Sequence, residues 1–236
     1  MRPWQHYPIL ECSETLEKLP GSLHCIEPHP YYSIGAPYGG GLDPFCLRKS
    51  VIGFLLRAQE ELQSISPNLK LAIFDAWRPI PVQSFMVDYV IRQQCLAKGL
   101  DRCNPDDALE VESVVESVYR FWAEPSYEPN TPPPHSTGGA VDLTLANKEG
   151  GILDMGGEID AISKVSEPDY YLEKSKSDSK SQSYLWHERR SLLAGVMKKA
   201  GFVQHPNEWW HFSYGDQMWA WTNHNENAIY GAWTSV

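Results

Sequence analysis

Apolar residues recur at helical spacing in several segments of the chain. Between Phe45 and Leu62 they stand at positions 51, 52, 54, 55, 58 and 62, which places them on one face of an α-helix. Two other apolar segments stop at Gly99 and Gly201, and glycine commonly follows the last residue of a helix. The pattern predicts four helices, at residues 45–62, 82–99, 108–123 and 186–200.

Alternating and β-branched residues predict strands at residues 69–76, 139–145 and 208–214. In the second of these, Val141, Leu143 and Leu145 fall on one face, whereas Asp142 and Thr144 fall on the other. Asp142 is therefore expected to point away from the apolar face of the sheet.

Three segments are expected to lack regular structure. Residues 1–45, with the run Gly39-Gly40-Gly41, are rich in Pro, Gly and Tyr and predict an extended N-terminal arm. Residues 124–134 hold five prolines, so they form a stiff loop that leads into His135. Residues 173–183 are a polar, Ser- and Lys-rich insertion, which predicts a mobile surface loop.

These elements predict one α+β domain over residues 1–236, with helices packed on one side of a small, mainly antiparallel sheet. A chain of 236 residues fits one hydrophobic core, and 42% apolar residues exclude a wholly disordered protein.

Charge and cysteine usage narrow the class of protein. The net charge is −10 and no basic stripe is present, so nucleic acid is not an expected partner. We see neither a membrane-spanning apolar run nor a secretory signal, and we expect a cytoplasmic protein without a membrane partner. The five cysteines include no C-x-x-C pair, which predicts reduced, mostly packed thiols; they are Cys12, Cys25, Cys46, Cys95 and Cys103.

Two short clusters carry candidate chemistry. The run from His135 to Asp142 and the run from Glu208 to His211 together supply two imidazoles and two carboxylates. Three such ligands would leave Zn²⁺ an open position for water, and a nearby carboxylate, here Glu208, could accept the proton of that water. Taken singly, each residue also has an ordinary structural explanation.

The spacing of these residues constrains the local geometry. Glu208 and His211 are three residues apart and would point to opposite faces of a regular strand, so a turn or bulge between Asn207 and Trp210 is needed. Gly138 and Gly139 would let the other segment fold back, so that both of its ligands face one ion.

Both clusters resemble motifs of a known family. His135-Ser-Thr-Gly-Gly-Ala-Val-Asp142 resembles the H-x-x-G-x-A-x-D motif of the D-alanyl-D-alanine metallopeptidases, and Glu208-Trp-Trp-His211 resembles their E-x-x-H element. Phe74-Asp-Ala-Trp-Arg78-Pro and Met155-Gly-x-x-Ile-Asp160 are similar to the VanX-type D-Ala-D-Ala dipeptidase branch. The resemblance implies the α+β architecture of these enzymes, which is hedgehog-like.

The resemblance also implies a role for each matching residue. His135, Asp142 and His211 would bind one Zn²⁺ per chain, and Glu208 would be the general base. Arg78 would stabilise the oxyanion of the transition state, its alternative being a surface salt bridge. Asp160 would bind the free ammonium of a dipeptide, its alternative being the N-cap of a helix that starts at residue 161.

The implied reaction is hydrolysis of a free D,D-dipeptide such as D-Ala-D-Ala. One alternative is a D,D- or L,D-carboxypeptidase acting on peptidoglycan stem peptides, which the missing leader disfavours; another is a non-catalytic zinc-binding module, which the presence of Glu208 and Arg78 disfavours. The chain departs from the family pattern at Pro133, where the family usually has a serine that helps to bind substrate. Five aromatic residues line the site or pack in the core: Tyr31, Tyr32, Trp77, Trp209 and Trp210. The oligomeric state is left open.

Overall fold

A five-stranded sheet lies at the centre of the computed structural model, which describes residues 2–39 and 43–233. Part of the predicted glycine run, at residues 40–41, lies outside the described residues. The strand order is β2-β4-β5-β7-β6; β2 pairs parallel with β4 and the other pairs are antiparallel. The strands are β2 (His24–Cys25), β4 (Leu69–Asp75), β5 (Ala140–Asn147), β6 (Val203–Gln204) and β7 (His211–Ser213). The predicted α+β class, with a mainly antiparallel sheet, is confirmed.

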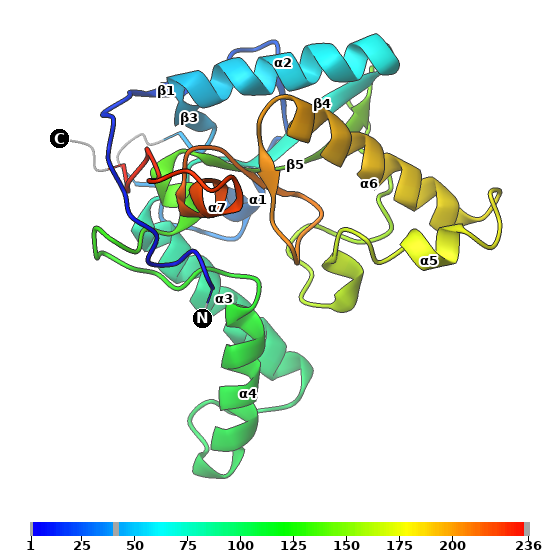
Figure 1. The fold of residues 1–236 in the computed structure, drawn as a ribbon. Helices are drawn as coiled ribbons and strands as arrows, with labels where there is room; N and C mark the ends of the chain where they lie inside the picture. Colours follow the sequence, from blue (N-terminus) through cyan, green and yellow to red (C-terminus); the bar gives the residue numbers. More distant parts are fainter. Residues whose placement is uncertain (1, 40–42, 234–236) are drawn as a thin grey trace.

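Two long helices pack on one face of this sheet, α2 (Lys49–Ile65) and α6 (Gln182–Lys199) (Figure 1). The apolar face predicted for the first helix is buried against the sheet, with Leu55 and Leu62 fully inaccessible to solvent. The helix begins four residues later than predicted, because residues 46–48 form strand β3 (Cys46–Arg48). This strand pairs with β1 (Leu16–Lys18) in a separate two-stranded sheet.

The helices α3 (Ile80–Ala97) and α4 (Ala108–Tyr119) form a hairpin that projects away from the sheet (Figure 1). They enclose a second apolar core, against which Tyr31 of the short helix α1 (Pro30–Ser33) and Phe74 of β4 also pack. The prediction that helices pack on one side of the sheet is therefore confirmed for α2 and α6 and wrong for this hairpin. A short 3-10 turn, Pro105–Asp107, precedes α4, which ends four residues earlier than predicted.

The polar insertion is more ordered than its composition predicts. Helix α5 (Leu172–Ser175) occupies its first part and α6 begins at Gln182, so only residues 176–181 form the connecting loop. The Tyr171 ring packs 4.8 Å from the Trp186 ring, and these two flanking aromatics anchor both ends of the segment. Composition alone does not reveal such an anchor, because it depends on residues outside the polar run.

The N-terminal arm is only partly irregular, contrary to the prediction, because β1, β2 and α1 lie within it. Its first residues lie along the C-terminal segment. Ile9 forms a parallel bridge with Ala228, and the Tyr7 hydroxyl donates to the Asn225 carbonyl at 2.6 Å. Trp4 is buried beside Trp221, a residue of the last helix, α7 (Gln217–Thr222). All five cysteines are free, although Cys12 and Cys103 are exposed rather than packed. Within the described ranges, we find no helix that is long and apolar enough to cross a membrane.

Candidate metal centre

The centre of the candidate site is a row of polar residues across three adjacent strands. Asp75 at the end of β4 lies opposite Asp142 of β5, which lies opposite His211 of β7. Neighbouring residues of β5 point the other way, and Val141 and Leu143 are fully buried in the core beneath α2 and α6. The prediction that Asp142 points away from the apolar face is confirmed.

His135 reaches this row from a 3-10 turn, Pro134–Thr137, that follows the predicted proline-rich loop. Gly138 ends the turn with a φ of 73°, a conformation that glycine adopts without strain. A side chain at position 139 would lie 2.5 Å from the Tyr214 carbonyl oxygen, so the close approach of the two segments requires Gly139. The two glycines thus let the chain fold back from His135 to Asp142, as expected.

The three potential ligands His135, Asp142 and His211 lie close enough to share one metal ion. His135 Nε2 is 3.2 Å from His211 Nδ1 and 3.2 Å from Asp142 Oδ2, and His211 Nδ1 is 3.0 Å from Asp142 Oδ1. Donors about 2.0–2.2 Å from a tetrahedral ion would be separated by roughly 3.3 Å. The separations therefore match the spacing of ligands around one Zn²⁺ ion.

The other ring nitrogen of each histidine has a partner of its own. His135 Nδ1 donates to the Ala76 carbonyl oxygen at 2.7 Å, and His211 Nε2 lies 3.2 Å from Ser213 Oγ. Such bonds orient a metal-binding imidazole and leave its second nitrogen free as a ligand. Two ring nitrogens and a buried carboxylate that converge in this way form a donor set suited to zinc.

Glu208 lies in the turn between β6 and β7, because the predicted strand at 208–214 is regular only from His211 to Ser213. The Glu208 amide donates to the His205 carbonyl at 3.3 Å, and this turn brings Glu208 to the same side as His211. Its Oε2 lies 3.8 Å from His211 Nδ1, and its buried Oε1 lies 3.4 Å from His205 Nδ1 without forming a hydrogen bond to any described residue. Burial and the charge of Asp142 raise the pKa of Glu208 to about 8.

Arg78 is buried rather than exposed, so the surface salt bridge weighed for it is excluded. Its Nε and Nη2 both donate to Asp75 Oδ2, at 3.0 and 2.7 Å, and its Nη1 donates to Gln83 Oε1 at 2.8 Å. Nη2 also lies 3.1 Å from the Tyr31 hydroxyl and 3.5 Å from Asp142 Oδ2. Burial alone would lower the pKa of Arg78, but the negative charges around it, chiefly that of Asp75, raise the pKa well above its usual value and keep the guanidinium charged.

Asp160 enters the pocket from the long connection after β5. No helix begins at residue 161, and Asp160 has a φ of 67°, so the helix N-cap considered for it is excluded. Its Oδ2 accepts a hydrogen bond from the Tyr31 hydroxyl at 2.8 Å. Burial and the nearby charge of Asp142 raise the pKa of Asp160 to about 7.

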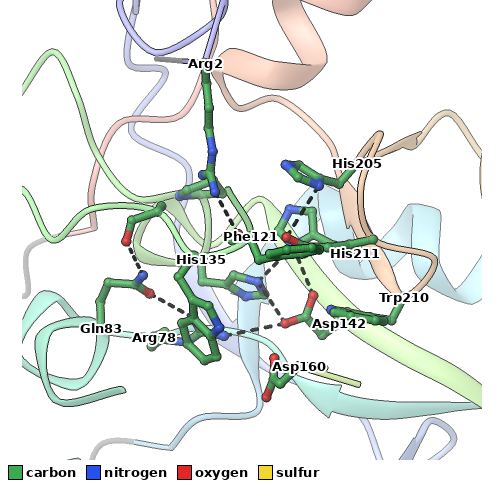
Figure 2. Close-up of a pocket in the computed structure, with 14 residues that line it drawn as sticks. Arg2, Arg78, Gln83, Phe121, His135, Asp142, Asp160, His205, Trp210 and His211 are labelled. Carbon is green, nitrogen blue, oxygen red and sulfur yellow. Dashed lines mark hydrogen bonds and ion pairs between the residues drawn. The ribbon is translucent and has the colours of Figure 1, made fainter. Parts of the chain in front are cut away.

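These residues line one small cavity of about 30 Å³ (Figure 2). Sequence reasoning missed Arg2, Gln83, Trp122 and His205, which also line it. It also gave no role to Asp75, although this residue stands in the run quoted around Arg78. The structure supplies the reason: Asp75 is fully buried and holds the Arg78 guanidinium in place.

The aromatic residues and Pro133 are distributed unequally around the pocket. Trp210 is buried and lines it, whereas Trp77 and Trp209 are buried outside it and Tyr32 is 46% exposed. Pro133 lines a neighbouring cavity of about 340 Å³.

The whole chain is similar to known peptidases. A family model described as D-ala-D-ala dipeptidase matches residues 25–229. A D-alanyl-D-alanine dipeptidase of Synechocystis sp. is 40% identical over 242 residues, which cover 98% of this chain and 96% of that protein. An enzyme with the same description from Escherichia coli is 31% identical and covers 61% of this chain and 55% of its own length. One from Enterococcus faecalis is 25% identical and covers 70% of this chain and 93% of its own length. A crystal structure of the vancomycin resistance D,D-pentapeptidase VanY in complex with Zn(II) matches 96% of both chains at 13% identity and a TM-score of 0.45.

Proposed function

The chain belongs to the D-Ala-D-Ala dipeptidase family, and we propose that it hydrolyses free D-Ala-D-Ala to two D-alanines with one Zn²⁺ ion per chain. One observation carries this proposal: a three-ligand cluster, a buried Glu208 whose Oε1 has no hydrogen bond to any described residue, and a buried Arg78 share one small pocket.

His135, Asp142 and His211 would hold the ion, since their donor atoms have the required chemistry and spacing. When bound, Zn²⁺ supplies a Lewis acid that polarises the substrate carbonyl and lowers the pKa of a coordinated water. The chain itself must then move protons and stabilise charge.

Glu208 is the proposed general base. Its Oε1 is buried without a hydrogen-bond partner among the described residues, so it is available to accept the proton of the attacking water. The same carboxyl group can pass that proton to the nitrogen of the leaving D-alanine as the peptide bond breaks.

Arg78 is the proposed stabiliser of the negative charge that develops on the carbonyl oxygen. Asp75 and Gln83 fix its guanidinium before substrate arrives, so the reaction need not reorganise it. Asp160 is proposed to bind the free ammonium of the dipeptide, which would distinguish a dipeptidase from a carboxypeptidase that acts on longer stem peptides.

The test is D-alanine release by purified, zinc-loaded protein from D-Ala-D-Ala and from its N-acetylated form. Cleavage of the free dipeptide alone supports the proposal. Preferential cleavage of the acetylated peptide would favour the carboxypeptidase alternative, and bound zinc without any cleavage would favour a non-catalytic module.

The pH dependence of substrate binding should report on Asp160. Its pKa of about 7 means that it is protonated in acid and becomes a carboxylate as pH rises through neutrality. Only the carboxylate attracts an ammonium group, so KM for D-Ala-D-Ala should fall by up to tenfold per unit as pH rises from about 5.5 to 7, and then level off. Asp160→Asn should raise KM at pH 8 and flatten this profile; an unchanged profile would remove Asp160 from substrate binding.

Arg78→Lys is expected to lower kcat by roughly 100-fold to 1,000-fold, because an ammonium group cannot reproduce the guanidinium fork toward Asp75 and the substrate oxygen. It should also reduce the free energy of unfolding, measured in urea, because Asp75 is fully buried and its Oδ2 loses one of the two hydrogen bonds from Arg78.

Arg190→Lys is the matched control, since Arg190 is equally buried but donates to the carbonyls of Met155 and Val165, outside the pocket. It should reduce stability and leave kcat nearly unchanged. Equal losses of kcat in the two variants would show that Arg78 acts only through stability.

A further inference from the structure

Arg2 brings a second guanidinium to the metal pocket from the far end of the chain. The N-terminal arm is held by Trp4, whose ring meets the His205 ring edge-on at 5.7 Å, and by the Tyr7 contact with the C-terminal segment. From this anchored arm, Arg2 extends into the same cavity as His135 and Glu208. Figure 2 shows its guanidinium entering on one side of the ligand cluster, with Asp160 on the opposite side.

The two guanidinium groups of the pocket differ in their partners. Arg78 already donates to Asp75, Gln83 and Tyr31. Arg2 donates only to the Phe121 carbonyl oxygen, at 2.7 Å, and it has no carboxylate partner within the described part of the chain. Burial lowers the pKa of Arg2, as expected for a cation that lacks a close anion, and the more distant Glu208 only partly opposes this effect.

We propose that Arg2 binds the C-terminal carboxylate of the dipeptide and so selects substrates with a free carboxyl end. The inference rests on the proposed dipeptidase function. D-Ala-D-Ala carries an ammonium at one end and a carboxylate at the other, and Asp160 and Arg2 offer the complementary charges on opposite sides of the metal ligands. Held at both ends, the dipeptide places its peptide bond between them, over the cluster that contains His135 and His211.

The chemistry and the space at Arg2 both fit this role. A guanidinium fork can donate two parallel hydrogen bonds to a carboxylate, the geometry that gives the strongest charge-assisted pairs. Arg2 and Trp122 also line the adjacent cavity of about 340 Å³, so the side chain has room to shift as the carboxylate enters. A substrate extended or amidated at this end would leave the guanidinium buried without an anion, which is unfavourable.

The test compares zinc-loaded wild type with Arg2→Gln and Arg2→Lys on two substrates, D-Ala-D-Ala and D-Ala-D-Ala amide. Wild type should prefer the acid by roughly 100-fold in kcat/KM, mostly through KM. Arg2→Gln should lose most of this preference by cleaving the acid about 100-fold less well while cleaving the amide within about threefold of wild type. Arg2→Lys, which keeps the charge, should retain an intermediate preference.

Lys18→Gln is the matched control, because it removes a cation of the same arm that pairs with Asp43 at the surface. It should change neither rate. Equal loss of both activities in Arg2→Gln, or equal cleavage of acid and amide by wild type, overturns the role of Arg2 and leaves the dipeptidase function standing. Failure of zinc-loaded wild type to cleave either substrate overturns the proposed function, and the inference with it.

Discussion

Glu208→Gln is expected to lower kcat for D-Ala-D-Ala by roughly 100-fold to 10,000-fold while the protein keeps its zinc. Glutamine has nearly the same shape but cannot accept a proton at neutral pH, so only the proton transfer is lost. Zinc content should be unchanged, because the three proposed ligands are His135, Asp142 and His211.

Stability separates this outcome from misfolding. Burial and Asp142 raise the pKa of Glu208 to about 8, well above its value in an unfolded chain, so folding favours the protonated form and ionisation costs stability as pH rises between about 4.5 and 8. The metal-free glutamine variant should therefore melt no lower than metal-free wild type at pH 8. Glu188→Gln, at an exposed position of α6, serves as the control and should keep full activity. Full activity in Glu208→Gln would exclude Glu208 as the base, and loss of zinc would make it a ligand.

His135→Ala is expected to abolish both zinc retention and D-alanine release. The change removes one of three ligands whose donor atoms lie 3.0–3.2 Å apart, and the remaining pair cannot hold the ion in the same geometry. Added zinc stabilises any protein that binds it only in the folded state. The melting temperature of wild type should therefore rise with zinc, whereas that of the variant should not.

His6→Ala removes an exposed imidazole from the N-terminal arm and provides the control, with unchanged zinc content and rate. A chelator should inactivate wild type reversibly, with activity restored by Zn²⁺. Stoichiometric zinc in His135→Ala, measured by elemental analysis, would show that the ion is held elsewhere.

The local chemistry of the site could be predicted from the sequence because it depends on residues close together in the chain. Apolar spacing identified the buried face of α2, and alternation in β5 separated Asp142 from Val141 and Leu143. The spacing of Glu208 and His211 required a turn or bulge between Asn207 and Trp210; the structure has a hydrogen-bonded turn slightly earlier, at residues 205–208, and bends at residues 209–210. Family motifs then pointed to His135, Asp142 and His211, which the fold brings together.

Prediction was weaker wherever distant segments decide the outcome. The polar composition of residues 173–183 concealed a helix that is anchored by Tyr171 and Trp186 on either side. The predicted first helix also wrongly included residues 45–48, because the apolar spacing does not reveal that β3 pairs with β1.

The sequence by itself determined the fold class and the residue types that can bind a metal, since periodicity and motif spacing are local properties of the chain. Only the tertiary structure decided that Asp75 neutralises Arg78, that Tyr31 bonds to Asp160, and that Arg2 reaches the pocket. These contacts join residues brought together by strand register and by docking of the arm. Their energies depend on burial, which excludes water and makes each unpaired charge costly, and burial exists only once the chain has folded.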